Sequence, residues 1–363
     1  MEKLLNQLEI DPKTRERINE SILYFRNLDK DNSKRILQFI ENDLSNYFLE
    51  LLDFKKECAD KKFDEKKAKK LNKKHDDIMH KGETLTDSIS SKIITKQIRA
   101  FFRDIGATLI YESEMFELGL KKPRGYPGDF QMMNYVYNNQ QSSQTPFGLY
   151  MDDYFISNGY AEAVRGRKNK MKEILVKILS TDQNPRIFNI PCGPSRDVQE
   201  ALSTFNKKIR SEILCVDNDQ EALDFSQGSI AKLKNSSVAK FFKGNILDYV
   251  RHPDKYKESL GEFDYVYSIG IADYFPDKFL QRFIRFCFNL LKNKGVLILA
   301  FKIKENDAFA PIPCKWFCDW EFVPRSYEDS IRVIRNSQLD NFDIIKTEWE
   351  ESNRVCFISI KKG

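Results

Sequence analysis

The sequence predicts an α/β protein whose mostly parallel, doubly wound sheet follows an N-terminal region of helices. Three observations predict this class: amphipathic helical patterns fill residues 1–120, strand and helix patterns alternate from Arg186 onward, and two strand-like runs joined by a short turn close the chain. Alternating strands and helices are typical of a parallel sheet covered by helices. We expect a helical domain at 1–120, a lid or connector at 121–158 and the sheet domain at 159–363.

Length and composition indicate a globular protein. Hydrophobic residues make up 41% of the 363 residues and aromatic residues 13%, which is enough for a large core. The net charge of +5 is small against 59 basic and 54 acidic residues, so it does not indicate a nucleic-acid partner. No apolar run is long enough to span a membrane, and the N-terminal segment lacks the apolar core of a signal peptide. We therefore expect a cytoplasmic protein.

The first 120 residues are expected to form amphipathic helices. Ser33 to Phe54 has apolar residues at helical spacing, with Ser33 as the N-cap, and Ser88 to Tyr111 repeats the pattern. Between them, 61–82 is dense in lysine. A phosphate-binding patch is one interpretation, but acids alternate with the lysines, which favours a solvated helix. The helices are candidates for a homodimer contact or for a cap over an active site.

Cysteine and histidine do not form a metal-binding pattern. Seven scattered cysteines are not a disulfide framework, and those in apolar runs are expected in the core. Cys314 and Cys318 are the closely spaced pair, without a second pair or a histidine to complete a zinc site. The three histidines (His75, His80 and His252) lie in strongly polar sequence surroundings. We predict no metal ion.

A loop of definite shape follows the helical region. Two glycines and two prolines lie within Lys122 to Asp129, before a helix rich in methionine and tyrosine. This loop presents Arg124, Tyr126 and Asp129. Loops that a scaffold holds in place often carry function, so the segment is either a lid over the site or a structural connector.

The predicted sheet begins with a strand, a tight turn and a helix. The apolar run that starts at Ile187 ends in Pro191-Cys192-Gly193, where glycine would let a ligand approach the backbone closely. A second apolar run ends in Asp217, at the interval where such folds place an acid that binds ribose. The two features together predict a nucleotide-type ligand.

The rest of the chain supplies further strands and their helices. Two more strands and a long helix lead to the fifth strand, and a helix and a hairpin follow. The expected ranges are 238–244 (strand), 263–275 (strand and loop), 276–291 (helix), 295–303 (strand), 326–337 (helix), and 342–350 and 354–362 (hairpin).

Five strands that alternate with helices and a closing hairpin resemble the Rossmann-like sheet of class I S-adenosylmethionine-dependent methyltransferases, whose last strand is antiparallel. The resemblance implies S-adenosyl-L-methionine as the cofactor. The first loop would hold its methionine part, the acid after the second strand its ribose and the third loop its adenine, while the fourth loop would border the transfer site. The residues at these places are Asn189, Pro191, Cys192 and Gly193, then Asp217 and Asn218, then Asn245, Ile246 and Asp248, and finally Ser268 and Gly270.

The first loop departs from the family pattern because Gly193 is its single glycine. A nicotinamide-dependent enzyme fits less well, since the G-x-G-x-x-G motif is absent.

Three segments carry a narrower resemblance: KPRGYPGDFQMMNYVY, FNIPCGPSRDV and YSIGIADYF. Together they are similar to bacterial methyltransferases of 3-hydroxypalmitic acid methyl ester biosynthesis. This resemblance implies methylation of a small molecule, such as the carboxylate of a 3-hydroxy fatty acid. The strand-five end AFKI departs from the family pattern.

A carboxylate acceptor is already ionised and needs no base, whereas an amine or hydroxyl acceptor would need an Asp or Tyr to remove its proton. Arg124 or Arg325 would pair with an acidic acceptor. The candidate catalytic residues are Arg124, Tyr126, Asp129, Tyr274 and Arg325, with Trp320 also lining the pocket. The alternatives are an N-methyltransferase of an amino acid or other amine, a nucleic-acid methyltransferase that uses the lysine-rich helix, and a binding protein without catalysis.

Overall fold

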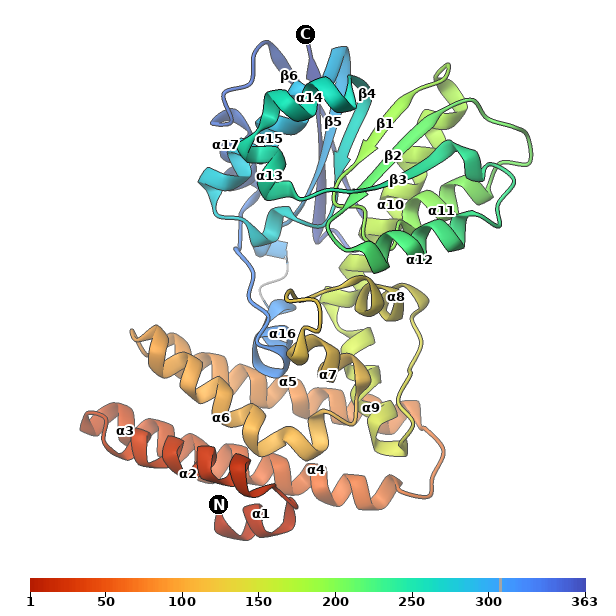
Figure 1. Cartoon of the computed structure of the whole chain (residues 1–363). Coiled ribbons are helices and arrows are strands. Elements are labelled where there is room, and N and C mark those ends of the chain that lie inside the picture. The colour runs from red at the N-terminus through yellow and green to blue at the C-terminus, as the bar shows by residue number, and fades with distance from the viewer. Residues whose placement is uncertain (307–308) are drawn as a thin grey trace. The chain divides into compact units, whose positions relative to one another are not determined.

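The computed structural model describes residues 1–306 and 309–363, which divide into two compact units (Figure 1). The helical unit comprises Met1–Gly128, Asn138–Ala161 and Phe309–Glu321, and the sheet unit comprises Asp129–Tyr137, Glu162–Ala308 and Phe322–Gly363. Each unit is thus built from three separate stretches of chain. The contiguous ranges expected from the sequence differ from this division, because a segment late in the chain belongs with the N-terminal helices.

The helical unit contains ten helical segments among the described residues. They are α1 (Glu2–Gln7), α2 (Pro12–Arg26), α3 (Lys30–Gln38), the π-helix η1 (Phe39–Leu44), α4 (Ser45–Cys58), α5 (Glu65–Asp87), α6 (Lys92–Ile110), α7 (Glu114–Lys121), α9 (Pro146–Ser157) and α16 (Pro311–Cys318).

Two predicted helices begin elsewhere than expected. The helix predicted from Ser33 starts one turn earlier, because Asp29 is its N-cap and accepts a hydrogen bond from the Asn32 N–H. The helix predicted from Ser88 is α6, which starts after the N-cap Ser91. The first turn of α3 is polar and carries no apolar periodicity, so the pattern alone does not show where that helix begins.

Helix α16 completes the core of the helical unit. Its Trp316 is fully buried, and the Phe102 ring lies 5.5 Å from the Trp316 ring and 5.2 Å from the Phe317 ring. Gly82 makes this packing possible, because a Cβ at that position would lie 2.5 Å from the indole. The absence of a side chain on α5 therefore admits the largest side chain of α16.

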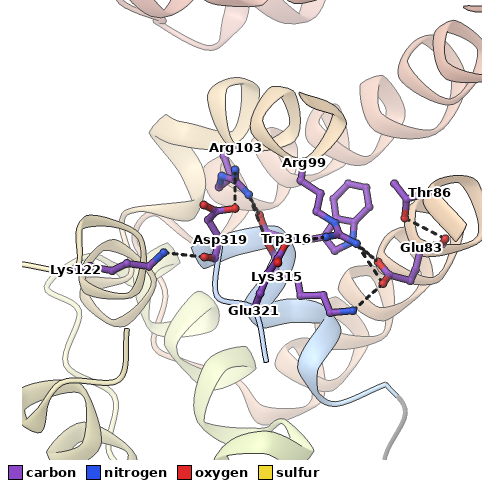
Figure 2. A network of polar contacts seen from close by, with 9 residues as sticks. All are labelled: Glu83, Thr86, Arg99, Arg103, Lys122, Lys315, Trp316, Asp319 and Glu321. Carbon is purple, nitrogen blue, oxygen red and sulfur yellow. Dashed lines mark hydrogen bonds and ion pairs between the residues drawn. The ribbon is translucent and has the colours of Figure 1, made fainter. Parts of the chain in front are cut away.

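Polar contacts hold the same segment in place (Figure 2). Glu83 accepts hydrogen bonds from the Trp316 indole at 2.9 Å and from Lys315 at 3.1 Å, and it pairs with Arg99 at 3.2 Å. Arg103 donates to the carbonyl oxygens of Lys315 and Trp316, both at 3.3 Å. Burial would raise the pKa of the Glu83 carboxyl, but the Trp316 hydrogen bond and the two cations outweigh it and hold that pKa below its usual value.

The lysine-rich segment forms α5 and agrees with the solvated-helix interpretation. Lys67 pairs with Glu57, Lys74 with Glu50, and Lys81 with Asp43 at 2.6 Å.

His75 lies in the core of the helical unit, although the sequence around it is polar. His75 faces the core of the unit, is fully buried, and has its Nδ1 2.7 Å from the Tyr47 hydroxyl. Burial lowers the pKa of His75 to about 3. Lys73, Lys74 and Asp77 nearby are exposed, so the polarity of the local sequence does not show that His75 is buried.

The sheet unit contains one seven-stranded sheet in the order β3-β2-β1-β4-β5-β7-β6 (Figure 1). Strands β1 to β5 are parallel, and β7 is antiparallel to both β5 and β6. The predicted fold class is confirmed. The strands are β1 (Arg186–Asn189), β2 (Glu212–Asp217), β3 (Ala239–Lys243), β4 (Phe263–Ser268), β5 (Leu291–Lys302), β6 (Phe342–Trp349) and β7 (Val355–Lys362).

Helices cover both faces of the sheet, and each face has its own apolar cluster. One cluster joins the sheet to α10, α11 and α12, and the other joins it to α13, α15 and α17. The helical segments that complete the chain are α8 (Phe130–Asn138), α10 (Gly159–Thr181), α11 (Arg196–Ser203), α12 (Gln220–Ile230), η2 (Ser236–Val238), α13 (Ile246–Arg251), α14 (Pro253–Leu260), η3 (Ala272–Tyr274), α15 (Asp277–Asn289), η4 (Lys304–Asn306) and α17 (Tyr327–Arg335).

The cysteines and the lengths of the apolar helices bear on two further expectations. All seven cysteines are buried with free thiols, and the expectation of core positions is confirmed for those in or beside apolar runs: Cys192, Cys215, Cys287 and Cys356. No helix in the described part of the chain is both long enough and apolar enough to cross a bilayer.

Candidate functional site

The sheet order changes direction between β1 and β4, and such switch points open a crevice at the carboxyl ends of the strands. The loop after β1 lies at this edge and is fixed from two sides. The Cys192 N–H donates to the Val216 carbonyl at 2.9 Å, and the Ser226 hydroxyl donates to the Gly193 carbonyl at 3.0 Å. Gly193 has a φ of +51°, and no atom lies within 4 Å of the place a Cβ would take. The loop is therefore held rigidly with one open side.

Asp217 lies at the end of β2 beside this loop. It is 8% exposed and accepts hydrogen bonds from the backbone N–H groups of Gly193 at 2.8 Å and Asp219 at 3.0 Å, one on each carboxylate oxygen. Burial raises the pKa of the Asp217 carboxyl, and the two backbone donors oppose that shift. Because a carboxylate offers about four acceptor positions, it can still accept two ligand hydroxyls.

Three buried side-chain oxygens at the ends of β1 and β4 have no hydrogen-bond partner among the described residues: Asn189 Oδ1, Ser195 Oγ and Ser268 Oγ. Asn189 is 1% exposed and Ser268 3%. A buried polar atom without a partner is costly, so such atoms in a native structure commonly mark a missing ligand or water. Their clustering around the switch point indicates a binding site for a polar ligand.

The ends of β2 and β3 hold the other predicted cofactor residues. Asn245 follows β3 and caps α13, because its Oδ1 accepts a hydrogen bond from the Leu247 N–H at 2.8 Å. Asp248 lies in the first turn of α13 with a side chain that is 51% exposed. Ile246 is half-buried and Asn218 is exposed. The residues predicted to bind cofactor thus gather at the carboxyl edge of four neighbouring strands, but their roles stay predictions.

Arg325 is engaged in holding the loop after β4. Its guanidinium donates to the carbonyl oxygens of Ala272 at 2.8 Å and Phe275 at 2.5 Å, and it pairs with Asp277 at 2.8 Å. The side chain is only 3% exposed. This arrangement fixes the loop beside Ser268 and disfavours the acceptor role predicted for Arg325.

The other candidate catalytic residues are divided between the units. Asp129 is buried in the sheet unit and caps α8, since its Oδ1 accepts a hydrogen bond from the Met132 N–H at 3.0 Å. The Tyr274 ring lies 5.8 Å from the Phe322 ring. Arg124 and Tyr126 belong to the helical unit, as does Trp320, which is buried against Tyr160. Their acceptor roles remain predictions.

Four residues that the sequence reasoning did not select surround the switch point. The Tyr267 hydroxyl donates to Asp197 Oδ2 at 2.8 Å, and burial raises the pKa of the Asp197 carboxyl to about 6. Tyr137 of α8 forms a hydrogen bond with Arg167 of α10. Asp197 could have been found, because it follows the first loop by three residues. Arg167 gave no signal, since it is one of many cations on a long amphipathic helix.

The mostly parallel sheet, its antiparallel β7 and the switch in strand order between β1 and β4 define a Rossmann-like class I methyltransferase architecture. The family described as "Putative methyltransferase" matches residues 53–255, and the chain belongs to this family. The prediction of a methyltransferase is thereby confirmed. Among curated proteins, none matches the sequence.

The chain is also similar to solved structures at low identity. A possible exported protein from Bordetella parapertussis is 12% identical with a TM-score of 0.54, over 97% of this chain and 99% of that chain. Magnesium protoporphyrin IX methyltransferase from Synechocystis, solved with S-adenosylhomocysteine, is 12% identical with a TM-score of 0.44, over 57% and 88%. An O-methyltransferase family protein from Burkholderia thailandensis is 13% identical with a TM-score of 0.42, over 58% and 62%. The class assignment rests on the family match and the sheet order.

Proposed function

We propose that this methyltransferase transfers a methyl group from S-adenosyl-L-methionine to the carboxylate of a small molecule, such as a 3-hydroxy fatty acid. The observation that carries the cofactor proposal is the carboxyl edge of the sheet. There Asp217 keeps acceptor capacity on both oxygens. Asn189, Ser195 and Ser268 each have a buried oxygen without a hydrogen-bond partner in the part of the chain that the structure describes. This donor and acceptor set fits a ligand with a ribose and an amino-acid end.

When bound, the cofactor would supply an electrophilic methyl group, and the protein would align the acceptor with it and exclude water. In this proposal Asp217 accepts the ribose hydroxyls, the 189–193 loop lies against the methionine part, and Asn245 lies at the adenine. The loop after β4, held by Arg325, borders the transfer site. None of these residues has to move a proton.

Among the possible acceptors, a carboxylate makes the smallest catalytic demand on the site, because it is ionised at neutral pH and needs no base. The resemblance of three sequence segments to methyltransferases of 3-hydroxypalmitic acid methyl ester biosynthesis supports this class. The proposal includes a cytoplasmic location, no nucleic-acid partner and a homodimer contact through the N-terminal helices.

An amine acceptor is the second candidate, and Asp273 favours it. This carboxyl lies in the loop after β4, is buried, and has its pKa raised mainly by burial. A carboxylate of raised pKa can take a proton from an ammonium group before methyl transfer.

Binding and product analysis together test the proposal. We expect titration calorimetry to show micromolar binding of S-adenosyl-L-methionine and S-adenosylhomocysteine and none of NADH. Incubation with 3-hydroxyhexadecanoate should yield its methyl ester in mass spectrometry, whereas amino acids should remain unmodified. Methylated amines would replace the carboxylate proposal with the second candidate. Absence of binding to either sulfur compound would contradict the cofactor proposal.

A further inference from the structure

Helix α5 carries lysines on two faces that meet different surroundings. One face lies beside η1 and α4, where lysines seven residues apart pair with acids seven residues apart. These ion pairs are Lys67 with Glu57, Lys74 with Glu50, and Lys81 with Asp43. The charge of this face is therefore balanced within the helical unit.

The outward face of α5 carries a second set of lysines, here called the lysine stripe: Lys66, Lys69, Lys70 and Lys73. Each lies three or four positions from two of the others, so they share one face of the helix. All of them are exposed. Within residues 1–306 and 309–363, no carboxylate forms an ion pair with any of them. Their ammonium groups thus lie together in solvent without an acid paired to them.

The nearby acids of the sequence lie at the two ends of the lysine stripe and not within it. Asp64 and Glu65 precede it, and Asp76 and Asp77 follow it. Asp64 is the N-cap of α5 and accepts hydrogen bonds from two backbone N–H groups, at 2.8 and 3.1 Å. One lysine of the stripe acts electrostatically on Asp153 of α9 without forming an ion pair. Because residues 61–74 hold eight lysines and two acids, the outward face keeps a local excess of positive charge.

An array of this kind matches a surface of mobile anions. A lysine ammonium is a point charge on a flexible stem, so it can follow lipid headgroups that move in the plane of a bilayer. Clusters of about four to eight basic residues on a helix are typical of binding to anionic lipids. Nucleic-acid sites add arginine forks or aromatic platforms to their lysines, and residues 64–77 contain no Arg, Phe, Tyr or Trp. This composition favours an anionic bilayer over nucleic acid.

The proposed acceptor supplies a separate reason. A long-chain acid and its uncharged methyl ester both partition into a bilayer, because each methylene that leaves water lowers the free energy. An enzyme docked there would meet its acceptor and release its product at the surface where both concentrate. This reason rests on the proposed function, whereas the argument from charge does not.

We propose that the lysine stripe docks the protein reversibly on an anionic lipid bilayer. The ammonium groups bind the phosphate groups of the lipid headgroups. The contact is electrostatic, since Leu71, the apolar residue of the same turn, is buried in the helical unit. Binding therefore depends on the charge of the lipid and falls steeply as salt is added.

The test variant replaces every lysine of the stripe by glutamine, and a second variant replaces them by arginine, which keeps the charge. A control variant removes the same number of charges at exposed positions of the sheet unit: Lys207→Gln, Lys208→Gln, Lys232→Gln and Lys278→Gln. Thermal unfolding establishes that each protein is folded. If the glutamine variant is not, the single substitutions Lys66→Gln and Lys73→Gln take its place.

The full-length protein is sedimented with vesicles of phosphatidylcholine, alone or mixed with an equal amount of phosphatidylglycerol. We expect wild type to bind the anionic vesicles only and to be released by high sodium chloride. Each lysine beside an anionic surface contributes about fivefold to affinity, so the glutamine variant should bind roughly 100-fold or more weakly. The arginine variant and the control variant should bind within about threefold of wild type.

The assay contains neither S-adenosyl-L-methionine nor an acceptor, so its outcome does not depend on the proposed methyl transfer. The inference is overturned if wild type sediments equally with neutral and anionic vesicles, or if the glutamine and control variants bind anionic vesicles alike. It is also overturned if wild type does not bind vesicles but binds double-stranded RNA through the stripe, since the partner would then be nucleic acid.

Discussion

The Glu83 network of the helical unit and the carboxyl edge of the sheet treat their buried polar groups in opposite ways. In the helical unit, the Glu83 carboxylate is matched by Trp316, Lys315 and Arg99 (Figure 2). At the carboxyl edge of the sheet, Asn189 Oδ1, Ser195 Oγ and Ser268 Oγ have no partner within residues 1–306 and 309–363. The helical unit has unsatisfied atoms too, but they are spread over several helices and a loop: Arg35 Nε, Asn72 Oδ1, His75 Nε2, Arg99 Nε and Ser143 Oγ.

This difference distinguishes buried polar groups that stabilise the fold from buried polar groups that can bind a ligand. A network whose charges are matched by protein groups stabilises a fold, and removing one member leaves the others buried without a partner. Oxygens without a protein partner add no protein–protein hydrogen bond to the stability of the fold. Such oxygens gain their partners when a ligand binds. Substitutions in the first region should therefore act on stability, and those in the second on binding.

The largest effect is expected for Glu83→Ala. It leaves Lys315 and the Trp316 N–H without their acceptor and Arg99 with Glu321 alone, so we expect the free energy of unfolding of the helical unit to fall by roughly 3 kcal/mol. Affinity for S-adenosylhomocysteine should be nearly unchanged. Glu57→Ala, which removes an exposed partner of Lys67, is the control and should leave the unfolding transition where it is. Equal effects of the two substitutions in denaturant unfolding would contradict the comparison.

Asp217→Asn should act mainly on binding. The amide keeps the shape of the carboxylate, but its NH2 group faces the N–H of either Gly193 or Asp219, which then lacks an acceptor. The substitution also removes the negative charge that would hold the ribose. We expect the affinity for S-adenosylhomocysteine to fall roughly 10- to 100-fold in calorimetry. Asp254→Asn, at an exposed site of α14, is the control. Unchanged affinity in Asp217→Asn would remove the assignment of Asp217 to the ribose.

Asp197→Asn should change how stability depends on pH. The pKa of Asp197 is about 6 in the folded protein against 3.8 as the ordinary value, so the folded state holds this proton more tightly than the unfolded chain does. The stabilising contribution is therefore complete at low pH and is lost as the pH rises through about 6. The neutral amide has no such loss, so the variant should gain roughly 1–3 kcal/mol relative to wild type between pH 4 and pH 8. Denaturant unfolding at both pH values measures this, and parallel curves would refute it.

The smallest effects are expected for two serine substitutions, one in each unit. The Ser113 hydroxyl of the helical unit donates to Asp152 at 2.6 Å and caps α7, so Ser113→Ala should cost about 1–2 kcal/mol of stability. Ser268→Ala removes an unmatched hydroxyl, so the stability of the free protein should stay the same or rise slightly. Its affinity for S-adenosylhomocysteine should fall about threefold to tenfold. A stability loss in Ser268→Ala equal to that in Ser113→Ala would contradict the ligand role.

The sheet could be predicted from the sequence because its signals are local. Buried parallel strands appear as short apolar runs, and Gly193 and Asp217 fall at the strand ends that the switch point brings together. The hairpin of β6 and β7 was recognisable from its turn. The strands along the chain and the positions of the acids therefore followed from patterns within single segments, whereas the order of the strands in the sheet is known from the structure.

The rest depends on contacts between distant segments, which no local pattern reports. Arg167 faces Gly270 across more than a hundred residues, and Trp316 packs against Gly82 across more than two hundred. Arg325 looked like a candidate for an acidic acceptor, whereas the structure surrounds it with Asp277 and backbone carbonyls. A single sequence shows where a charged residue occurs in the chain, but not which group it contacts in the folded protein.

The division of the helical unit among separate stretches of chain has a consequence for synthesis on the ribosome. The chain passes between the units five times, and Phe309–Glu321 is the last part of the helical unit to be made. Glu83 and Gly82 thus leave the ribosome long before Lys315 and Trp316. During that interval the N-terminal helices present an uncovered apolar surface and an unmatched carboxylate. We expect nascent chains that end before residue 309 to engage chaperones, and full-length chains to be released from them.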